Sequence, residues 1–121
     1  MTSILTVDDS ASIRQAIKIA LGAEGYQVTG AANGADGLTK ASAGGYDLII
    51  TDLNMPVMDG LSMIRALRAK PNGAGVPILF LSTENDAEVK AHARAAGATG
   101  WLTKPFTPDQ LVRVVKKVLA S

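Results

Sequence analysis

"LIITDLNMPVMDG", residues 48–60 of this 121-residue chain, contains the clearest signal of the fold. It opens with a short β-branched run, which predicts a buried strand ending at Asp52. A loop rich in methionine and proline follows, and Asp59-Gly60 then introduces a helix with Leu61, Ile64 and Leu67 at helical spacing. The segment therefore predicts one strand–loop–helix unit, with an acidic residue at the end of the strand.

The same alternation continues outward on both sides of this segment. Strands are predicted at Ile4–Val7, Tyr26–Ala31, Leu48–Asp52, Ile78–Leu81 and Gly100–Thr103, and helices after Ser10, over residues 34–43, after Gly60, over residues 85–96 and after Thr107. The last helix carries a capping box, with Thr107 as its cap, Pro108 at its first position and Gln110 reaching back. Strands that are separated by helices and apolar throughout are parallel and buried on both faces. We therefore predict an α/β fold, a (βα)5 three-layer sandwich.

Composition limits the possible functions. The chain is 47% hydrophobic and 19% charged, and it has no cysteine, which excludes disulfides, thiolate catalysis and cysteine-based zinc sites. No apolar run is long enough to span a bilayer, and the acidic N-terminal segment does not resemble a signal peptide. We expect a cytoplasmic protein with one domain over residues 1–121. A net charge of +1 gives no reason to expect a nucleic acid or a membrane as partner.

Polar residues gather where the predicted strands end. Asp8-Asp9, Asp52, Ser82 and Lys104 each follow a different strand, and the carboxyl ends of parallel strands lie at one edge of the sheet. Clustered carboxylates repel one another and need a cation to remain ionised together. Their hard oxygen donors suit Mg²⁺, which shares phosphate oxygens with its ligands. The residues thus predict a magnesium-dependent site for a phosphoryl group, in which a carboxylate can act as nucleophile.

Four separated motifs resemble the receiver domain of response regulators. They are Val7-Asp8-Asp9-Ser10, the loop from Asp52 to Gly60, Leu81-Ser82-Thr83 and Lys104-Pro105-Phe106, and the resemblance spans essentially the whole chain. It implies a flavodoxin-like fold with the strand order 2-1-3-4-5. The residues after Asp9 are most similar to stand-alone chemotaxis regulators of the CheY type.

The resemblance also implies a role for each site residue. Asp52 would be the phosphoacceptor, taking a phosphoryl group from a sensor histidine kinase, with Ser82 and Lys104 contacting that group. The Mg²⁺ ligands would be Asp8, Asp9, Asp52 and the backbone carbonyl of Asn54. Ser82 and Trp101 would form the switch, although an indole is bulkier than the tyrosine or phenylalanine usual at this position. The Lys104–Pro105 bond is expected to be cis.

Plainer interpretations compete with these roles. Asp9 alone would most often be a helix cap, Ser82 a turn hydroxyl with Thr83 as its neighbouring decoy, and Trp101 an ordinary core residue. The capping interpretation weakens when Asp9 is taken together with Asp52, Ser82 and Lys104.

For output we expect a monomer that acts through protein contacts and not as an enzyme. The leading hypothesis is chemotaxis, with a chemotaxis kinase and the flagellar motor switch protein as partners. The alternative is a phosphate sink or phosphorelay intermediate. An enzymatic alternative is a haloacid dehalogenase-type aspartyl phosphatase. However, Asn54 stands where that family needs a general acid. The nucleophile of that family also follows the first strand, whereas Asp52 ends the third.

Overall fold

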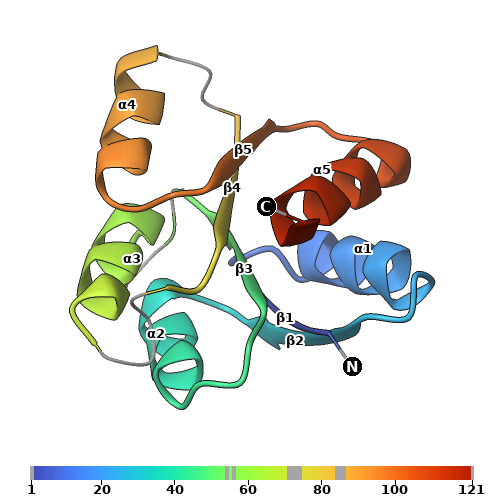
Figure 1. Cartoon of the computed structure of the whole chain (residues 1–121), viewed down its shortest axis with the longest axis horizontal. Coiled ribbons are helices and arrows are strands. Elements are labelled where there is room, and N and C mark those ends of the chain that lie inside the picture. Colours follow the sequence, from blue (N-terminus) through green and yellow to red (C-terminus); the bar gives the residue numbers. More distant parts are fainter. Residues whose placement is uncertain (1, 54, 56, 71–74, 84–86, 121) are drawn as a thin grey trace.

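The computed structural model describes residues 2–53, 55, 57–70, 75–83 and 87–120. Its strands are β1 (Ser3–Val7), β2 (Gln27–Ala31), β3 (Leu48–Asp52), β4 (Ile78–Ser82) and β5 (Gly100–Thr103). Its helices are α1 (Ala11–Gly22), α2 (Gly34–Ser42), α3 (Gly60–Arg68), α4 (Ala87–Ala95) and α5 (Pro108–Ala120). Strand and helix alternate along the chain, as the sequence predicts (Figure 1).

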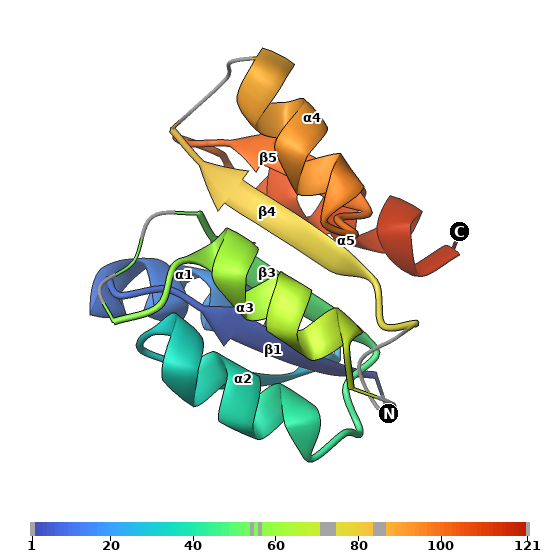
Figure 2. The same ribbon diagram turned by 90° about the vertical axis from the view of Figure 1, so that its left-hand side faces the viewer.

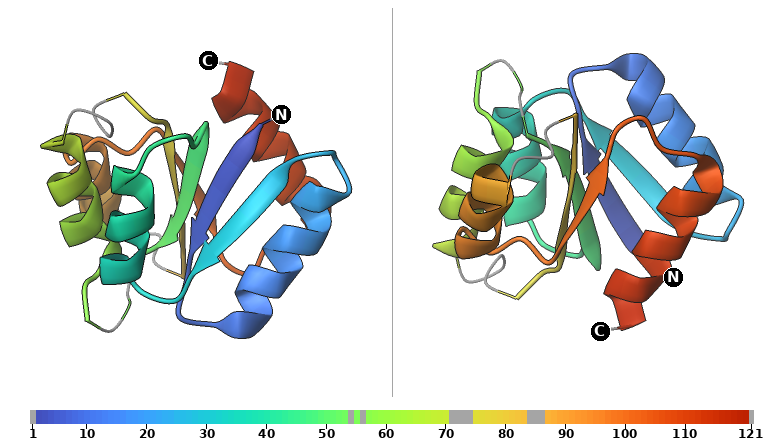
Figure 3. Two further views of the ribbon diagram at one scale, coloured as in Figure 1. Left: turned by 90° about the horizontal axis from the view of Figure 1, so that it is seen from below. Right: turned by 90° about the horizontal axis from the view of Figure 1, so that it is seen from above.

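The five strands form one parallel sheet in the order β2-β1-β3-β4-β5. Helices α1 and α5 cover one face of the sheet, and α2, α3 and α4 cover the other (Figure 3). The same layering is visible in Figure 2, where α2, α3 and α4 lie in front of the strands. The predicted three-layer, flavodoxin-like architecture and its strand order are confirmed.

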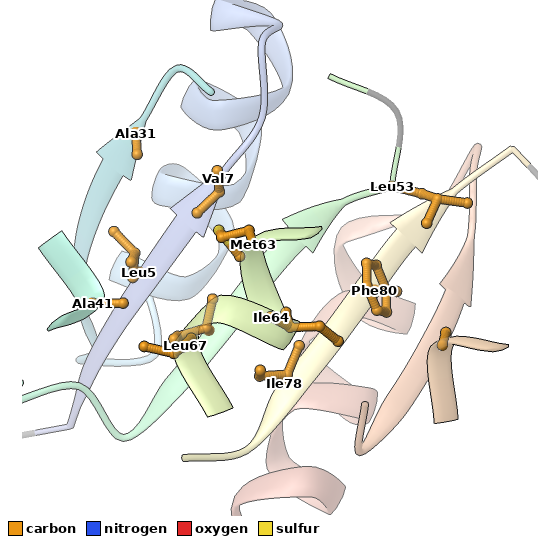
Figure 4. Close-up of a cluster of buried hydrophobic side chains, with 12 residues drawn as sticks. Leu5, Val7, Ala31, Ala41, Leu53, Met63, Ile64, Leu67, Ile78 and Phe80 are labelled. Carbon is orange, nitrogen blue, oxygen red and sulfur yellow. The ribbon is translucent and has the colours of Figure 1, made fainter. Parts of the chain in front are cut away.

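Each face of the sheet has its own hydrophobic core. Leu5, Val7, Phe80 and their neighbours pack beneath α2, α3 and α4, with Met63, Ile64 and Leu67 contributed by α3 (Figure 4). The other core lies under α1 and α5, which bury Ile17, Leu21, Leu111, Val115 and Val118 against Ile4, Leu48, Ile50, Leu79 and Leu81. Because successive strand residues point to opposite faces, strands β1, β3 and β4 supply both cores.

Local signals place most helix ends where the sequence predicts them. Gly25 and Gly97 have positive φ angles, and the residue after each donates its N–H back to the last helical turn, Tyr26 to Leu21 and Ala98 to Ala93. This is the Schellman arrangement that favours glycine. At the start of α5, Thr107 and Gln110 exchange hydrogen bonds of 2.9 and 3.1 Å, so the predicted capping box is confirmed.

Two details differ from the sequence expectation. Strand β2 begins at Gln27 and not at Tyr26, because the N–H of Tyr26 is used in the turn that ends α1. In α3 the buried stripe includes Met63, whereas Leu61 is only half-buried and packs against the core.

Candidate functional site

Three carboxylates meet at the carboxyl edge of the sheet. Asp8 and Asp9 follow β1, Asp52 ends β3, and each offers an oxygen within 4.8 Å of the others. Asp8 is buried, Asp52 is intermediate and Asp9 is exposed. Because β1 and β3 are neighbours in the sheet, the fold itself brings these acids together.

Asp8 is the most firmly held of the three. Its backbone N–H donates to the carbonyl of Ala31 at 3.0 Å, which extends the pairing of β1 with β2 by one residue. Its Oδ1 accepts the N–H of Ser10 at 2.9 Å, and its Oδ2 accepts from Lys104 Nζ at 3.1 Å. A buried carboxylate needs such partners to remain charged.

Lys104 lies between the two inner acids. Its Nζ is 3.1 Å from Asp8 Oδ2 and 3.4 Å from Asp52 Oδ1, and its side chain is only 17% exposed. The backbone N–H of Lys104 donates to the Ser82 carbonyl at 2.8 Å, which continues the pairing of β4 with β5. The Lys104–Pro105 bond is cis, as the resemblance implies.

The surroundings of Asp52 oppose the ionisation of its carboxyl group. Burial raises the pKa of its carboxyl group above the ordinary 3.8, Lys104 opposes that rise, and the nearby Asp8 charge adds to it. Its Oδ1 also accepts the N–H of Leu53 at 2.9 Å. The carboxylate is therefore held in place but incompletely neutralised, a state that an added cation would relieve.

Ser82 and Thr83 are clearly distinguished by burial. Ser82 is 1% exposed at the end of β4, whereas Thr83 is exposed beyond the strand. The register pairs Leu81 with Asp52, so Ser82 lies one step past the acid along the adjacent strand. This position at the carboxyl edge favours Ser82 over Thr83 as the site hydroxyl.

Trp101 lies on β5, half-buried against the core beneath α4. Its ring centroid is 5.8 Å from that of Phe80 at an angle of 43°, and Lys90 Nζ on α4 lies 5.9 Å from it. Its indole nitrogen is buried and has no hydrogen-bond partner among the described residues. The side chain is thus packed on one side and unsatisfied at its polar atom.

Asp9 is not the helix cap. The N-cap of α1 is Ser10, whose hydroxyl accepts the N–H of Ile13 at 3.3 Å. Asp9 therefore remains exposed at the carboxylate cluster, which supports the site interpretation over the capping one. Asn54, the fourth predicted metal ligand, lies outside the described residues.

Sequence reasoning missed two residues that shape the site. Arg14, one turn into α1, donates from its guanidinium to the backbone carbonyl of Asp8 at 2.6 Å. Gly60 lets α3 begin close to β3, because a Cβ at this position would lie 2.3 Å from the carbonyl oxygen of Asp52. Helical spacing from Ser10 could have suggested the first contact, whereas the second depends on tertiary packing.

The donor set fits a hard divalent cation. All three side chains offer carboxylate oxygens, two of the acids are at least partly buried, and their charge exceeds that of the single lysine among them. Oxygen ligands with partial exposure leave room for the waters that Mg²⁺ retains. The residues present are therefore compatible with magnesium.

A family model for the response regulator receiver domain matches residues 4–116. The chain belongs to this family. Receiver domains are the phosphoacceptor switches of two-component signalling and take their phosphoryl group from histidine kinases. They bind Mg²⁺ at an acidic pocket, and this receiver domain has a cluster of three aspartates.

The similar proteins include both a transcriptional regulator and a chemotaxis regulator. The transcriptional regulatory protein PrrA of Mycobacterium tuberculosis is 37% identical over 116 residues, which cover 96% of this chain and 49% of PrrA. The chain thus spans about half the length of the curated relatives it matches. The chemotaxis response regulator CheY4 of Vibrio cholerae is 45% identical, with a TM-score of 0.93 and 98% coverage of both chains.

A third similar protein is a receiver domain that was solved with magnesium. It belongs to the sensor histidine kinase PA1611 of Pseudomonas aeruginosa and is 33% identical, with a TM-score of 0.91 and coverage of 99% of this chain and 98% of that one. Its magnesium ion is coordinated in the active site cleft. Among the described residues of the present receiver domain, no helix is long and apolar enough to cross a membrane.

Proposed function

We propose that this receiver domain accepts a phosphoryl group on Asp52. The observation that carries the proposal is the position of Asp52 beside Asp8 and Asp9, with Lys104 Nζ 3.4 Å from its Oδ1. Asp52 is the acid of the cluster that ends the central strand, and its side chain is 12% exposed, so an incoming group can reach it. Its partial burial also removes part of the water that would hydrolyse an acyl phosphate.

The reaction transfers a phosphoryl group from a nitrogen or oxygen atom of the donor to a carboxylate oxygen of Asp52. An Asp52 oxygen forms the new bond to phosphorus while the bond from phosphorus to the donor breaks, and the donor group leaves with the electron pair. From a phosphohistidine the leaving group is the imidazole. Lys104 is already adjacent and its ammonium offsets the negative charge on the transferred group.

Asp8, Asp9 and Asp52 are the side chains proposed to hold Mg²⁺, with the Asn54 carbonyl as a further ligand. When bound, the ion supplies positive charge to the phosphoryl oxygens in transfer. Lys104 then exchanges part of its contact with Asp52 for contact with the phosphoryl group, while its 3.1 Å contact to Asp8 keeps it in place.

Ser82 and Trp101 are the proposed switch. The Ser82 hydroxyl, at the end of β4, would bind a phosphoryl oxygen and draw the following loop inward. Trp101 lies two residues before Thr103, which pairs with Ser82 across the sheet, so movement at Ser82 would be transmitted to β5. The output face would then comprise α4, β5 and α5.

Intact-mass spectrometry after incubation with acetyl phosphate tests the phosphoacceptor directly. We expect one phosphoryl adduct that requires Mg²⁺ and that is absent from Asp52→Asn and after chelation. Asp47→Asn is a matched control, because Asp47 is an exposed acid at the opposite edge of the sheet, and it should be phosphorylated normally. An adduct that persists in Asp52→Asn would place the acceptor elsewhere.

For output we propose phosphorylation-dependent binding to a protein of the chemotaxis pathway, with a chemotaxis kinase as donor and the flagellar motor switch as target. Similarity to CheY4 over nearly the full length of both chains supports this assignment. Binding of purified motor-switch protein should strengthen on phosphorylation. Weak binding that is indifferent to phosphorylation would argue against this output.

A phosphate sink or phosphorelay role is the second candidate. Its support is the similarity to the receiver domain of a sensor histidine kinase. It requires rapid transfer of the phosphoryl group from Asp52 back to a histidine. Radiolabelled phosphoryl group that fails to return to the kinase would exclude the role.

A further inference from the structure

A cavity lies between α1 and the strands β1 and β2, on the face of the sheet that α1 and α5 cover. It has a volume of about 230 Å³ and is lined by Thr6 of β1, Val28 and Gly30 of β2, and Ala11, Arg14, Gln15 and Lys18 of α1. No acidic side chain is among its lining residues. The cavity is therefore a basic pocket between a helix and the two strands beneath it.

The sheet register explains why this space exists. Thr6 pairs with Gly30 on the adjacent strand, so the position beside the threonine has no side chain. A Cβ on Gly30 would lie 3.4 Å from Cδ of Arg14, and Ala11 above it is also small. The two small residues leave the gap, and Arg14 lies across it.

The Thr6 hydroxyl is a buried polar group without a partner in the described part of the chain, on a residue that lines the cavity. Thr6 is 1% exposed, and its Oγ1 is buried without a hydrogen-bond partner among the described residues. An unsatisfied buried hydroxyl destabilises the folded state. Since valine would fill the same place at no such cost, the hydroxyl is better explained by a ligand that it contacts.

The cavity walls also supply donors with unused capacity. One guanidinium nitrogen of Arg14 donates to the Asp8 carbonyl, and the other guanidinium N–H groups remain available. Within the described part of the chain, neither Lys18 nor Gln15 forms a side-chain hydrogen bond or ion pair. Two cations, an amide and a hydroxyl thus surround a space that is large enough for a small ion.

We propose that this cavity binds a small oxyanion of the phosphate class. Charge-assisted hydrogen bonds from Arg14 and Lys18 would hold two of its oxygens, with Thr6 donating to a third. The cavity, at about 230 Å³, has room for the free ion. The proposed site is separate from the carboxylate cluster, because none of the three aspartates lines it, although Arg14 contacts both the cavity and the backbone carbonyl of Asp8.

NMR titration of the ¹⁵N-labelled protein with inorganic phosphate tests the proposal. Chelator is present throughout, so that phosphate does not associate with a metal at the carboxylate cluster. We expect saturable shifts of the backbone amides around the cavity. Lys18→Gln should weaken binding about tenfold, the loss of one charge-assisted bond, and Thr6→Val about fivefold. Thr6→Val should also raise the stability of the phosphate-free protein.

Two further variants separate binding inside the cavity from attraction to the positive surface around it. Lys70→Gln removes the same charge from an exposed residue beyond α3 and should change the affinity less than twofold. Gly30→Val keeps every donor but fills the space, and it should abolish binding while the protein stays folded.

Four results would overturn the proposal. The absence of saturable shifts would mean that the cavity holds water only. Equal weakening by Lys70→Gln would indicate diffuse charge attraction, and phosphate binding that survives Gly30→Val would place the ion elsewhere. If glycerol phosphate binds as tightly as phosphate, the site recognises a monoester and not the free ion.

Discussion

The surroundings of Asp52 disfavour the ionised form of its carboxyl group, which is the form that its proposed role requires. Burial and the neighbouring Asp8 charge raise the pKa of its carboxyl group, whereas its proposed role as nucleophile needs the ionised form. Lys104, 3.4 Å away, reduces this conflict without removing it. The site therefore keeps a reactive carboxylate at some cost to the stability of the metal-free fold.

That cost predicts a pH-dependent gain from Asp52→Asn. Because the pKa of Asp52 is raised on folding, the group favours the folded state below its unfolded value, near 3.8, and this contribution is lost as pH rises through the folded pKa. At pH 7 without metal, the variant should have a higher free energy of unfolding than the wild type. Urea denaturation of both proteins at pH 7 and pH 3 measures this difference in the free energy of unfolding. A gain of equal size at both pH values would show that the charge of Asp52 is not its cause.

Val57 offers a second test at the residue scale. Its φ is 71°, in the left-handed region that β-branched residues avoid, and the residue is 82% exposed, so few contacts compensate the strain. Val57→Gly should raise the free energy of unfolding by about 0.5–1 kcal/mol, the strain relieved less the added entropy of glycine. Val57→Ala, which retains a Cβ, should gain less. Thermal and urea denaturation of both variants measure these changes. A loss of stability in Val57→Gly would show that the backbone at Val57 is not strained.

Among the elements, α3 depends on its close approach to β3. A Cβ on Gly60 would lie 2.3 Å from the Asp52 carbonyl oxygen and 2.8 Å from Cε1 of Phe80, both closer than packing allows. Gly60→Ala should therefore destabilise the fold by about 2 kcal/mol, within the range for overpacking, and slow phosphorylation by displacing Asp52. The measurements are urea denaturation and the rate of adduct formation with acetyl phosphate.

The matched control for that change is Gly22→Ala at the end of α1. A Cβ there meets nothing within 4 Å, so the variant should gain about 0.5–1 kcal/mol from helix propensity and be phosphorylated at the normal rate. If Gly60→Ala behaved like Gly22→Ala, the close contact between α3 and β3 would not matter for the site.

The limits of sequence reasoning are also clearest at the level of the elements. The strands and the capping box of Thr107 were predictable because short-range periodicity and local hydrogen bonds determine them. Alternation of strands and helices likewise predicted that Asp8, Asp52 and Lys104 would meet. The register that pairs Thr6 with Gly30 could not be predicted, because it arises from packing between strands distant in sequence. The close approach of Gly60 to Asp52 could not be predicted either, because it depends on how α3 packs against β3.

At the scale of the whole molecule, the carboxylate cluster draws on segments far apart in the chain. Asp8 and Asp9 follow β1, Asp52 ends β3 and Lys104 follows β5, so their arrangement exists only when the sheet is assembled. A ligand that needs this arrangement binds the folded state and not the unfolded chain. Metal binding should therefore stabilise the entire domain cooperatively.

The size of that stabilisation can be predicted from the affinity. At a Mg²⁺ concentration about 100 times the Kd, the free energy of unfolding should rise by about 2.7 kcal/mol. The gain should shrink strongly in Asp9→Asn, which removes an exposed carboxylate of the cluster without disturbing the core. Asp109→Asn, an exposed acid in the first turn of α5, should retain the full gain. Calorimetric titration gives the Kd and urea denaturation the stability; equal gains in both variants would mean that Mg²⁺ acts by general screening and not through these three aspartates.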